Sequence, residues 1–170
     1  LNEMSPDDRT ALFEEMPPNV VKQLLNYLSF DERKIAQQLL GYPENSIGRL
    51  MTPDYIAVKE YWTVQDTLDY IRKYGRDKET LNILFVVDES GKLIDDIRIR
   101  DILLASPDTK IRDLMDGNFV SLKVNDDQES AIEIFKKYDR TALPVTDSSG
   151  MLVGIVTVDD VLDIAEEETT

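Results

Sequence analysis

The chain has 170 residues, which suits one ordinary domain or two small ones, and 42% of them are hydrophobic, enough to form packed cores. Asp and Glu total 34 against 19 Lys and Arg, so the net charge is −15 at pH 7. That charge argues against nucleic acid and anionic membrane surfaces as partners, because both attract cationic patches, and it favours metal ions or basic surfaces.

Two absent residue types narrow the chemistry further. The sequence has no cysteine, which excludes disulfides, zinc–thiolate sites and thiol nucleophiles, and no histidine, which removes the commonest general base. Because no nucleophile–base pair can be drawn, we do not expect an enzyme. Any bound metal needs oxygen ligands, which indicates magnesium, calcium or manganese. No apolar run approaches the ~20 residues that span a bilayer, no signal peptide is visible and the chain opens on Leu1, so we expect a soluble piece of a longer protein.

Residues 1–48 are predicted to form short amphipathic helices in series. Ser5 followed by Pro6 is a helix start, with the serine as N-cap and the proline at the first helical position. Ser29 and Glu32 have the spacing of a capping box and begin a further helix. Helices of similar length joined by tight turns indicate an α-helical array.

From Leu50 onward the sequence repeats itself. The stretch LMTPDYIAVK at Leu50 aligns with LMDGNFVSLK at Leu114, and further on FVVDESGKLIDDIRIRDIL aligns with PVTDSSGMLVGIVTVDDVL, which places Asp101 over Asp160. A period of about 60 residues marks a repeated structural unit. Each copy predicts a short strand, an amphipathic helix, a strand, a hairpin turn, a strand and a final helix. The strands are expected at YIAVK, NILFVVD, FVSLK, TALPVTD and MLVGIVTV, with turns at DESG and DSSG.

This repeat resembles a cystathionine β-synthase (CBS) domain pair. The resemblance implies an α+β fold in which a short α-helical array precedes a tandem CBS pair, also called a Bateman module. We therefore expect three parts: residues 1–48 as the C-terminal part of a helical N domain, 49–112 as the first CBS domain and 113–170 as the second CBS domain with an acidic exit helix. Modules of this family sense small ligands, and their two copies pack about a pseudo-twofold axis and often dimerise, which implies a homodimer.

The CBS resemblance also implies a nucleotide site. The family segment Gly-x-x-Thr-x-x-Asp binds adenosine nucleotides such as ATP, and here it is matched by Gly154, Thr157 and Asp160. Their implied roles are close backbone approach, phosphate hydrogen bonding and capture of the ribose hydroxyls. The alternative is that these residues only form a strand-to-helix turn, with Thr157 or Asp159 as N-cap.

The first copy departs from that segment. Asp95 stands where glycine is expected and Arg98 where threonine is expected, although Asp101 retains the aspartate. At most one nucleotide site is therefore expected to be intact.

The whole arrangement resembles the cytosolic region of MgtE-type magnesium transporters and channels. The matching motifs are GRLMTPDYIAV, KYDRTALPV and GIVTVDDVLDIAEEE. The resemblance implies a magnesium-sensing regulatory domain at the cytoplasmic face of the cell membrane, connected in the full-length protein to a transmembrane pore domain. The implied magnesium ligands are Asp8 (with Asp7 as a near alternative) on the helical array and Asp139, Asp160, Asp163 and Glu168 on the CBS side.

The acidic stretch VTVDDVLDIAEEE fits this function on physical grounds. Like charges three and four residues apart destabilise a helix, and two carboxylates ~4 Å apart repel by about 4 kcal/mol at an effective dielectric constant of ~20. Magnesium is held by one or two carboxylates and keeps several waters, so facing acids suffice to bind it. We therefore expect high magnesium to favour a closed arrangement of the helical and CBS parts. Two alternatives stay open: a nucleotide-sensing CBS module of another effector, and an assembly scaffold whose acids, Glu166 to Glu168 above all, only confer solubility.

Overall fold

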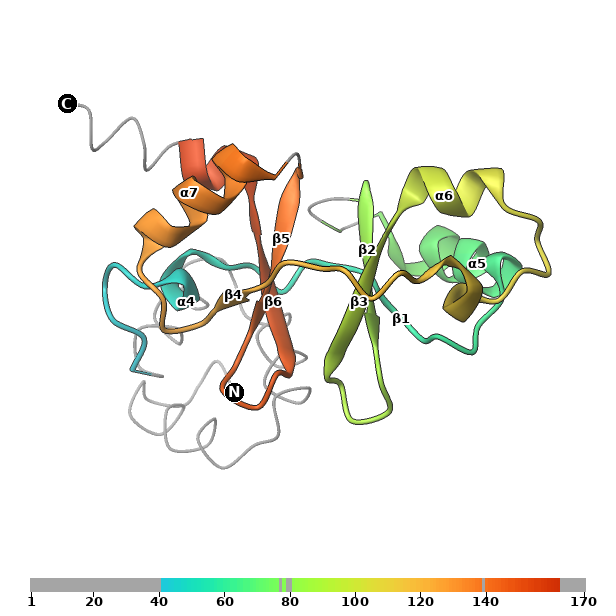
Figure 1. The fold of residues 1–170 in the computed structure, drawn as a ribbon, viewed down its shortest axis with the longest axis horizontal. Coiled ribbons are helices and arrows are strands. Elements are labelled where there is room, and N and C mark those ends of the chain that lie inside the picture. The colour runs from blue at the N-terminus through green and yellow to red at the C-terminus, as the bar shows by residue number, and fades with distance from the viewer. Residues whose placement is uncertain (1–40, 77, 79–80, 139, 163–170) are drawn as a thin grey trace.

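The computed structural model of the protein describes residues 41–162, except 77, 79, 80 and 139. The helices predicted within residues 1–40 lie outside these residues, as does the acidic tail from residue 163. In the described part, two three-stranded sheets stand side by side with their helices on the outer flanks (Figure 1). Each sheet belongs to one copy of the sequence repeat.

The first repeat contains strands β1 (Ala57–Val58), β2 (Ile83–Val87) and β3 (Leu93–Arg98) with helices α5 (Val64–Tyr74) and α6 (Ile99–Leu104). The strand order is β1-β2-β3, in which β1 pairs with β2 in parallel and β2 pairs with β3 antiparallel. All five residues of β2 are buried, as expected for a central strand covered on both faces.

The second repeat has the same architecture. Its strands are β4 (Leu122–Lys123), β5 (Ala142–Thr146) and β6 (Leu152–Thr157), and its first helix is α7 (Gln128–Lys137). The order is β4-β5-β6, again with one parallel and one antiparallel pairing. A helical turn begins at Val158, where the sequence predicts a helix after the last strand. The strands and their order within each copy agree with the expectations from the sequence.

The hairpins are built by the turn chemistry that the sequence contains. Asp88 Oδ1 accepts hydrogen bonds from the backbone of Ser90 and Lys92, and the following Gly91 has a φ of +96°, which glycine adopts without strain. In the second repeat, Asp147 and Gly150 take the same roles. The two hairpin tips then pair with each other: Leu93 N donates to the carbonyl of Gly150 and Leu152 N to that of Gly91, each at 3.1 Å.

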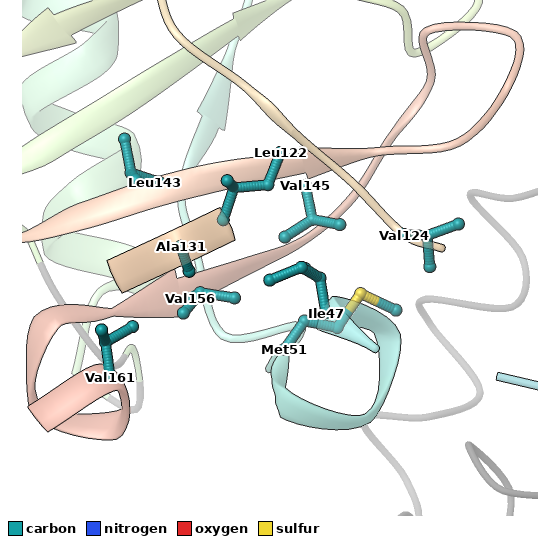
Figure 2. Close-up of a cluster of buried hydrophobic side chains, with 9 residues drawn as sticks. All are labelled: Ile47, Met51, Leu122, Val124, Ala131, Leu143, Val145, Val156 and Val161. Atoms are coloured by element: carbon teal, nitrogen blue, oxygen red, sulfur yellow. The ribbon is translucent and has the colours of Figure 1, made fainter. Parts of the chain in front are cut away.

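Three clusters of buried side chains hold the two repeats together. One fills the first repeat beneath α5, and a second fills the second repeat, where Ile47 and Met51 lie against Val156 and Val145 (Figure 2). The third lies between the sheets, and its members come from both of them: Tyr55, Ile83, Phe85, Val87, Leu93, Ala142, Leu152 and Ile155. Burial of this shared cluster makes each repeat depend on the other.

The opening segment of each repeat packs into the core of the other one. Helix α4 (Ile47–Leu50) precedes the first repeat, yet Ile47 is fully buried in the core of the second. The 3₁₀ helix η1 (Ile111–Leu114) precedes the second repeat, yet Ile111 is fully buried in the core of the first. This exchange brings each opening segment against the last strand of the opposite repeat.

Candidate functional site

The structure describes one of the five predicted magnesium ligands, Asp160. The other four, Asp8, Asp139, Asp163 and Glu168, lie outside the described residues. The predicted nucleotide segment, in contrast, is described in full, so its geometry can be compared with both interpretations of that motif.

Thr157 and Asp160 form a closed turn at the end of β6. The Thr157 hydroxyl donates to Asp160 Oδ2 at 2.9 Å, and the Asp160 backbone N–H lies 3.4 Å from the same hydroxyl oxygen. Thr157 is buried and Asp160 is half-buried. This is the geometry of a helix start in which Thr157 caps the turn, as the structural alternative predicts. It also holds the Asp160 carboxylate in one orientation, and such a carboxylate suits magnesium, which one or two carboxylates hold while it keeps several waters.

Gly154 is closely approached by the protein's own chain. A Cβ atom on Gly154 would lie 2.8 Å from the sulfur of Met51, which is closer than real Cβ contacts. Two backbone hydrogen bonds next to it join Thr52 and Ile155, at 2.8 and 2.9 Å. The absence of a side chain at Gly154 thus admits the opening segment of the first repeat.

The corresponding position of the first repeat, Asp95, is built differently. Its side chain is fully buried and accepts hydrogen bonds from the backbone N–H groups of Asp96, Asp116 and Gly117, at 2.8 to 3.0 Å. Asp116 and Gly117 belong to the opening segment of the second repeat. The Asp95 carboxylate therefore holds this segment by hydrogen bonds, whereas backbone pairing holds the opening segment of the first repeat beside Gly154. Asp95, which stands in place of the glycine of the family segment, therefore forms a structural joint between the two repeats.

Beside this joint lies a cleft that we call the arginine cleft. It consists of two adjoining pockets of about 300 and 250 Å³, both lined by Arg98, Arg100 and Arg140. Arg98 and Arg100 lie at the junction of β3 and α6 in the first repeat, whereas Arg140 precedes β5 of the second. The larger pocket also has Asn82, Ile83, Ile99 and Thr141 in its wall, and the smaller one has Asp96, Ile97, Asp101, Leu114 and Asp116.

Asp96, Asp101 and Asp116 balance the three arginines in the smaller pocket. The larger pocket is lined by the same arginines and, among the described residues, by no carboxylate, so in a chain of net charge −15 the larger pocket is a place for an anion. Guanidinium groups pair bidentately with phosphate and also stack on aromatic rings, and the aliphatic walls of Ile83 and Ile99 offer an apolar surface. Asp101, the aspartate that this repeat retains, lines the same cleft. The arrangement therefore has the groups that a nucleotide needs.

One carboxylate of the cleft is partly withdrawn from water. Burial raises the pKa of Asp96 above its usual value, and the nearby Arg140 guanidinium partly offsets this rise. The Asp95 and Asp116 carboxylates act in the same direction as burial, because neighbouring negative charges disfavour ionisation. Asp96 and Arg140 form an ion pair with 3.7 Å between Oδ1 and the guanidinium nitrogen.

Sequence reasoning missed Arg100, Arg140 and Asp96 as site residues. The family segment has threonine at the position of Arg98, so this arginine indicates a lost site when only that segment is considered. A sequence signal existed in the run IRIRD, which places two arginines beside the retained Asp101. Arg140 carries no such signal, because it comes from the other repeat.

The described residues contain no group of three or more acidic side chains placed to hold a metal ion. Within the same part of the chain, no helix has the length and apolar character needed to cross a bilayer.

Comparison with protein families finds two matches along the chain. The CBS domain model matches residues 47–108 and 111–167, and the MgtE intracellular N domain model matches residues 1–45. Both agree with the resemblances drawn from the sequence motifs and confirm the α+β fold with a tandem CBS pair.

Among characterised relatives, the chain is 40% identical over 153 residues to the magnesium transporter MgtE of Thermus thermophilus and 36% identical over 168 residues to that of Bacillus subtilis. These alignments cover 90% and 99% of this chain but only 34% and 37% of the transporters, so the chain spans little more than a third of their length. Among solved structures, it resembles the crystal structure of the cytosolic domain of the Mg2+ channel MgtE in complex with ATP. The TM-score is 0.74 at 34% identity, covering 95% of this chain and 76% of that one.

Proposed function

Because the chain belongs to the MgtE family, with an MgtE intracellular N domain followed by a CBS domain pair, we propose that it is the magnesium-sensing regulatory region of a magnesium transporter. Its place would be the cytoplasmic face of the membrane, attached to a transmembrane pore domain. Its role would be regulatory rather than catalytic, since the sequence has neither histidine nor cysteine to form a nucleophile–base pair.

The observation that carries this proposal is the position of Asp160. The carboxylate is half-buried and oriented by Thr157 at the start of the helical turn that leads into the acidic tail. It is thus available on the CBS side for a cation shared with acids of the helical part, for which Asp8 is the proposed counterpart. Asp139, Asp163 and Glu168 are proposed as further ligands on the CBS side.

The proposed regulation follows from charge. With 34 acidic residues against 19 basic ones, the helical and CBS parts repel each other where their acids face, and the repulsion is strongest at low ionic strength. Acids that share a divalent cation lose this repulsion, so the closed arrangement becomes the favoured one as magnesium rises. A ligand that binds only the closed state stabilises it in proportion to the logarithm of its concentration.

A magnesium titration followed by small-angle X-ray scattering tests the proposal, with sodium chloride holding the ionic strength constant. We expect the radius of gyration to fall and saturate with magnesium, and to stay unchanged in the sodium series. The Asp160→Asn/Asp163→Asn variant should lose most of this compaction. Asp108→Asn/Asp113→Asn is the matched control, because it removes two exposed carboxylates at a distance from Asp160 in sequence. Normal compaction of the first variant, or equal compaction by sodium, would refute the assignment.

A second candidate function, adenosine-nucleotide sensing, is favoured by the arginine cleft. The solved relative bound to ATP belongs to the same family, and the cleft combines three arginines with an aspartate suited to ribose hydroxyls. We place the proposed site at Arg98, Arg100 and Asp101 of the first repeat rather than at Gly154 and Thr157. In this chain Met51 packs against Gly154 and the Thr157 hydroxyl is bonded to Asp160.

We also propose that the chain forms a homodimer through its CBS domains. Leu103 and Leu162 hold the same position in the two repeats and are 64% and 56% exposed, and Leu104 is 75% exposed. Apolar side chains repeated at one position of both copies suit a second copy of the chain, because a symmetric partner can cover both at once. The helices that carry them lie along the upper edge of the molecule in Figure 1.

A further inference from the structure

Arg140 takes part in two features of the structure at once. Its guanidinium lies 3.7 Å from the Asp96 carboxylate, and it lines both pockets of the arginine cleft. Asp96 belongs to β3 in the first repeat, and Arg140 is separated from β5 of the second only by Thr141. The ion pair therefore connects the two repeats and engages the guanidinium of one of the three arginines that line the cleft.

This ion pair is enclosed but loosely bonded. The Asp96 and Arg140 side chains are 8% and 21% exposed, whereas the two partners of the Lys136–Glu133 pair on α7 are more than 70% exposed. Water solvates an enclosed carboxylate poorly, so Asp96 depends on its arginine. A separation of 3.7 Å nevertheless exceeds the roughly 2.7–2.9 Å of a tight charge-assisted hydrogen bond, so the guanidinium is not fixed in a bidentate pair.

We propose that Arg140 is a ligand-binding residue of the arginine cleft and that Asp96 competes with the ligand for its guanidinium. The ligand is a nucleotide-type phosphate ester, and in this respect the inference rests on the nucleotide function proposed above. A phosphate group carries up to two negative charges and three acceptor oxygens, so it is a stronger partner for a guanidinium than one carboxylate. Binding thus exchanges a contact between the repeats for a contact with the ligand.

This exchange gives the cleft a route to the rest of the molecule. Arg140 follows directly on residue 139 and, with Thr141, leads into β5, whereas Asp96 adjoins Asp95, which holds the opening segment of the second repeat. A ligand that removes Arg140 from Asp96 leaves an enclosed carboxylate beside Asp95 and Asp116 without its counter-charge. Binding of the ligand at the first repeat therefore changes the charge balance at the junction between the repeats.

Isothermal titration calorimetry with ATP in the presence of a metal chelator measures the affinity for ATP and so tests this competition. Asp96→Asn keeps the shape of the side chain and removes its charge, so we expect it to strengthen ATP binding by about three- to tenfold. Arg140→Met should weaken binding, and the gain from Asp96→Asn should vanish in the Asp96→Asn/Arg140→Met double variant. Asp116→Asn is the matched control: it removes a charge from the same pocket wall and keeps the oxygen that accepts from the Asn118 N–H. It should change the affinity less than Asp96→Asn.

The outcomes separate this inference from the function on which it rests. Equal ATP affinity of the wild type and Asp96→Asn would refute the competition and leave nucleotide binding standing. A gain that persists without Arg140, or that Asp116→Asn reproduces, would be a general charge effect and would also overturn the inference. Absence of ATP binding in both the wild type and Asp96→Asn would refute nucleotide binding itself, and the inference with it.

Discussion

Asp95 and Gly154 occupy the same position in the two repeats, and each is matched to a different neighbour. Gly154 leaves room for Met51, while the Asp95 carboxylate replaces a missing backbone pairing by accepting three N–H groups. A buried carboxylate is tolerated when hydrogen bonds satisfy it. The two sites therefore diverge because of how the chain packs at each of them, whatever ligands they bind.

Removal of the Asp95 side chain should destabilise the protein. Asp95→Ala leaves the N–H groups of Asp96, Asp116 and Gly117 without this acceptor, and we expect the free energy of unfolding to fall by about 1–3 kcal/mol. Urea denaturation followed by circular dichroism measures the change. Glu89→Ala, at an exposed hairpin position, is the control and should stay within about 0.5 kcal/mol of the wild type. Equal stability of the two variants would show that the joint contributes nothing.

At the scale of elements, each long helix of the described part begins with a side chain that caps it. Helix α5 has a full capping box, in which Thr63 Oγ1 accepts from the Asp66 N–H and Asp66 Oδ2 accepts from the Thr63 N–H, both at 3.0 Å. Helix α7 is capped by Asp127, whose side chain accepts from the Glu129 N–H. Basic residues end both helices and offset the helix dipole.

The capping box gives α5 a defined pH dependence. Hydrogen bonds from the Thr63 backbone and side chain lower the pKa of Asp66 in the folded protein. The contribution of this carboxylate to stability is therefore present above the unfolded-state pKa of about 4 and is lost as pH falls through the lowered folded value. We expect Asp66→Asn to be less stable than the wild type at pH 7 and the difference to shrink in acid, measured by urea denaturation at several pH values. A difference for Asp66→Asn that is constant with pH would contradict the assignment.

At the scale of the whole molecule, the two repeats form one cooperative unit. Each opening segment lies in the opposite core, the hairpin tips pair, and a shared apolar cluster fills the space between the sheets. Neither repeat contains all the residues of its own core. The leucines left exposed at corresponding positions are therefore the surface on which we expect a further copy to pack.

The proposed dimer can be tested at Leu104, which adjoins Leu103 and is the most exposed large hydrophobic residue of the described part of the chain. Leu104→Lys places a charge in the proposed apolar interface, and we expect it to raise the dimer dissociation constant by roughly tenfold or more. Sedimentation-velocity experiments over a range of protein concentrations measure the constant. Tyr61→Lys, at an exposed aromatic of the first repeat, is the control and should dimerise as the wild type does. A monomeric wild type, or an unchanged dimer of Leu104→Lys, would refute this interface.

The sequence by itself determined the repeat, the order of strands and helices, and the turns. These features depend on local patterns, namely alternating and continuous apolar runs and the aspartate and glycine of the hairpins. The motifs also identified the family. The magnesium ligands proposed from the same resemblance all remain predictions, and of them only Asp160 lies among the described residues.

Only the tertiary structure decided which side chains meet across the two repeats. Arg98 and Arg140 lie far apart in sequence and line one cleft. Met51 and Gly154 also lie far apart in sequence, and they pack against each other. Local pattern contains no information on such pairs, because they depend on which repeat buries each opening segment. Burial of the cluster shared by the two sheets, which contains Ile83 of β2 and Ala142 of β5, brings Arg140 beside Arg98 and Asp96.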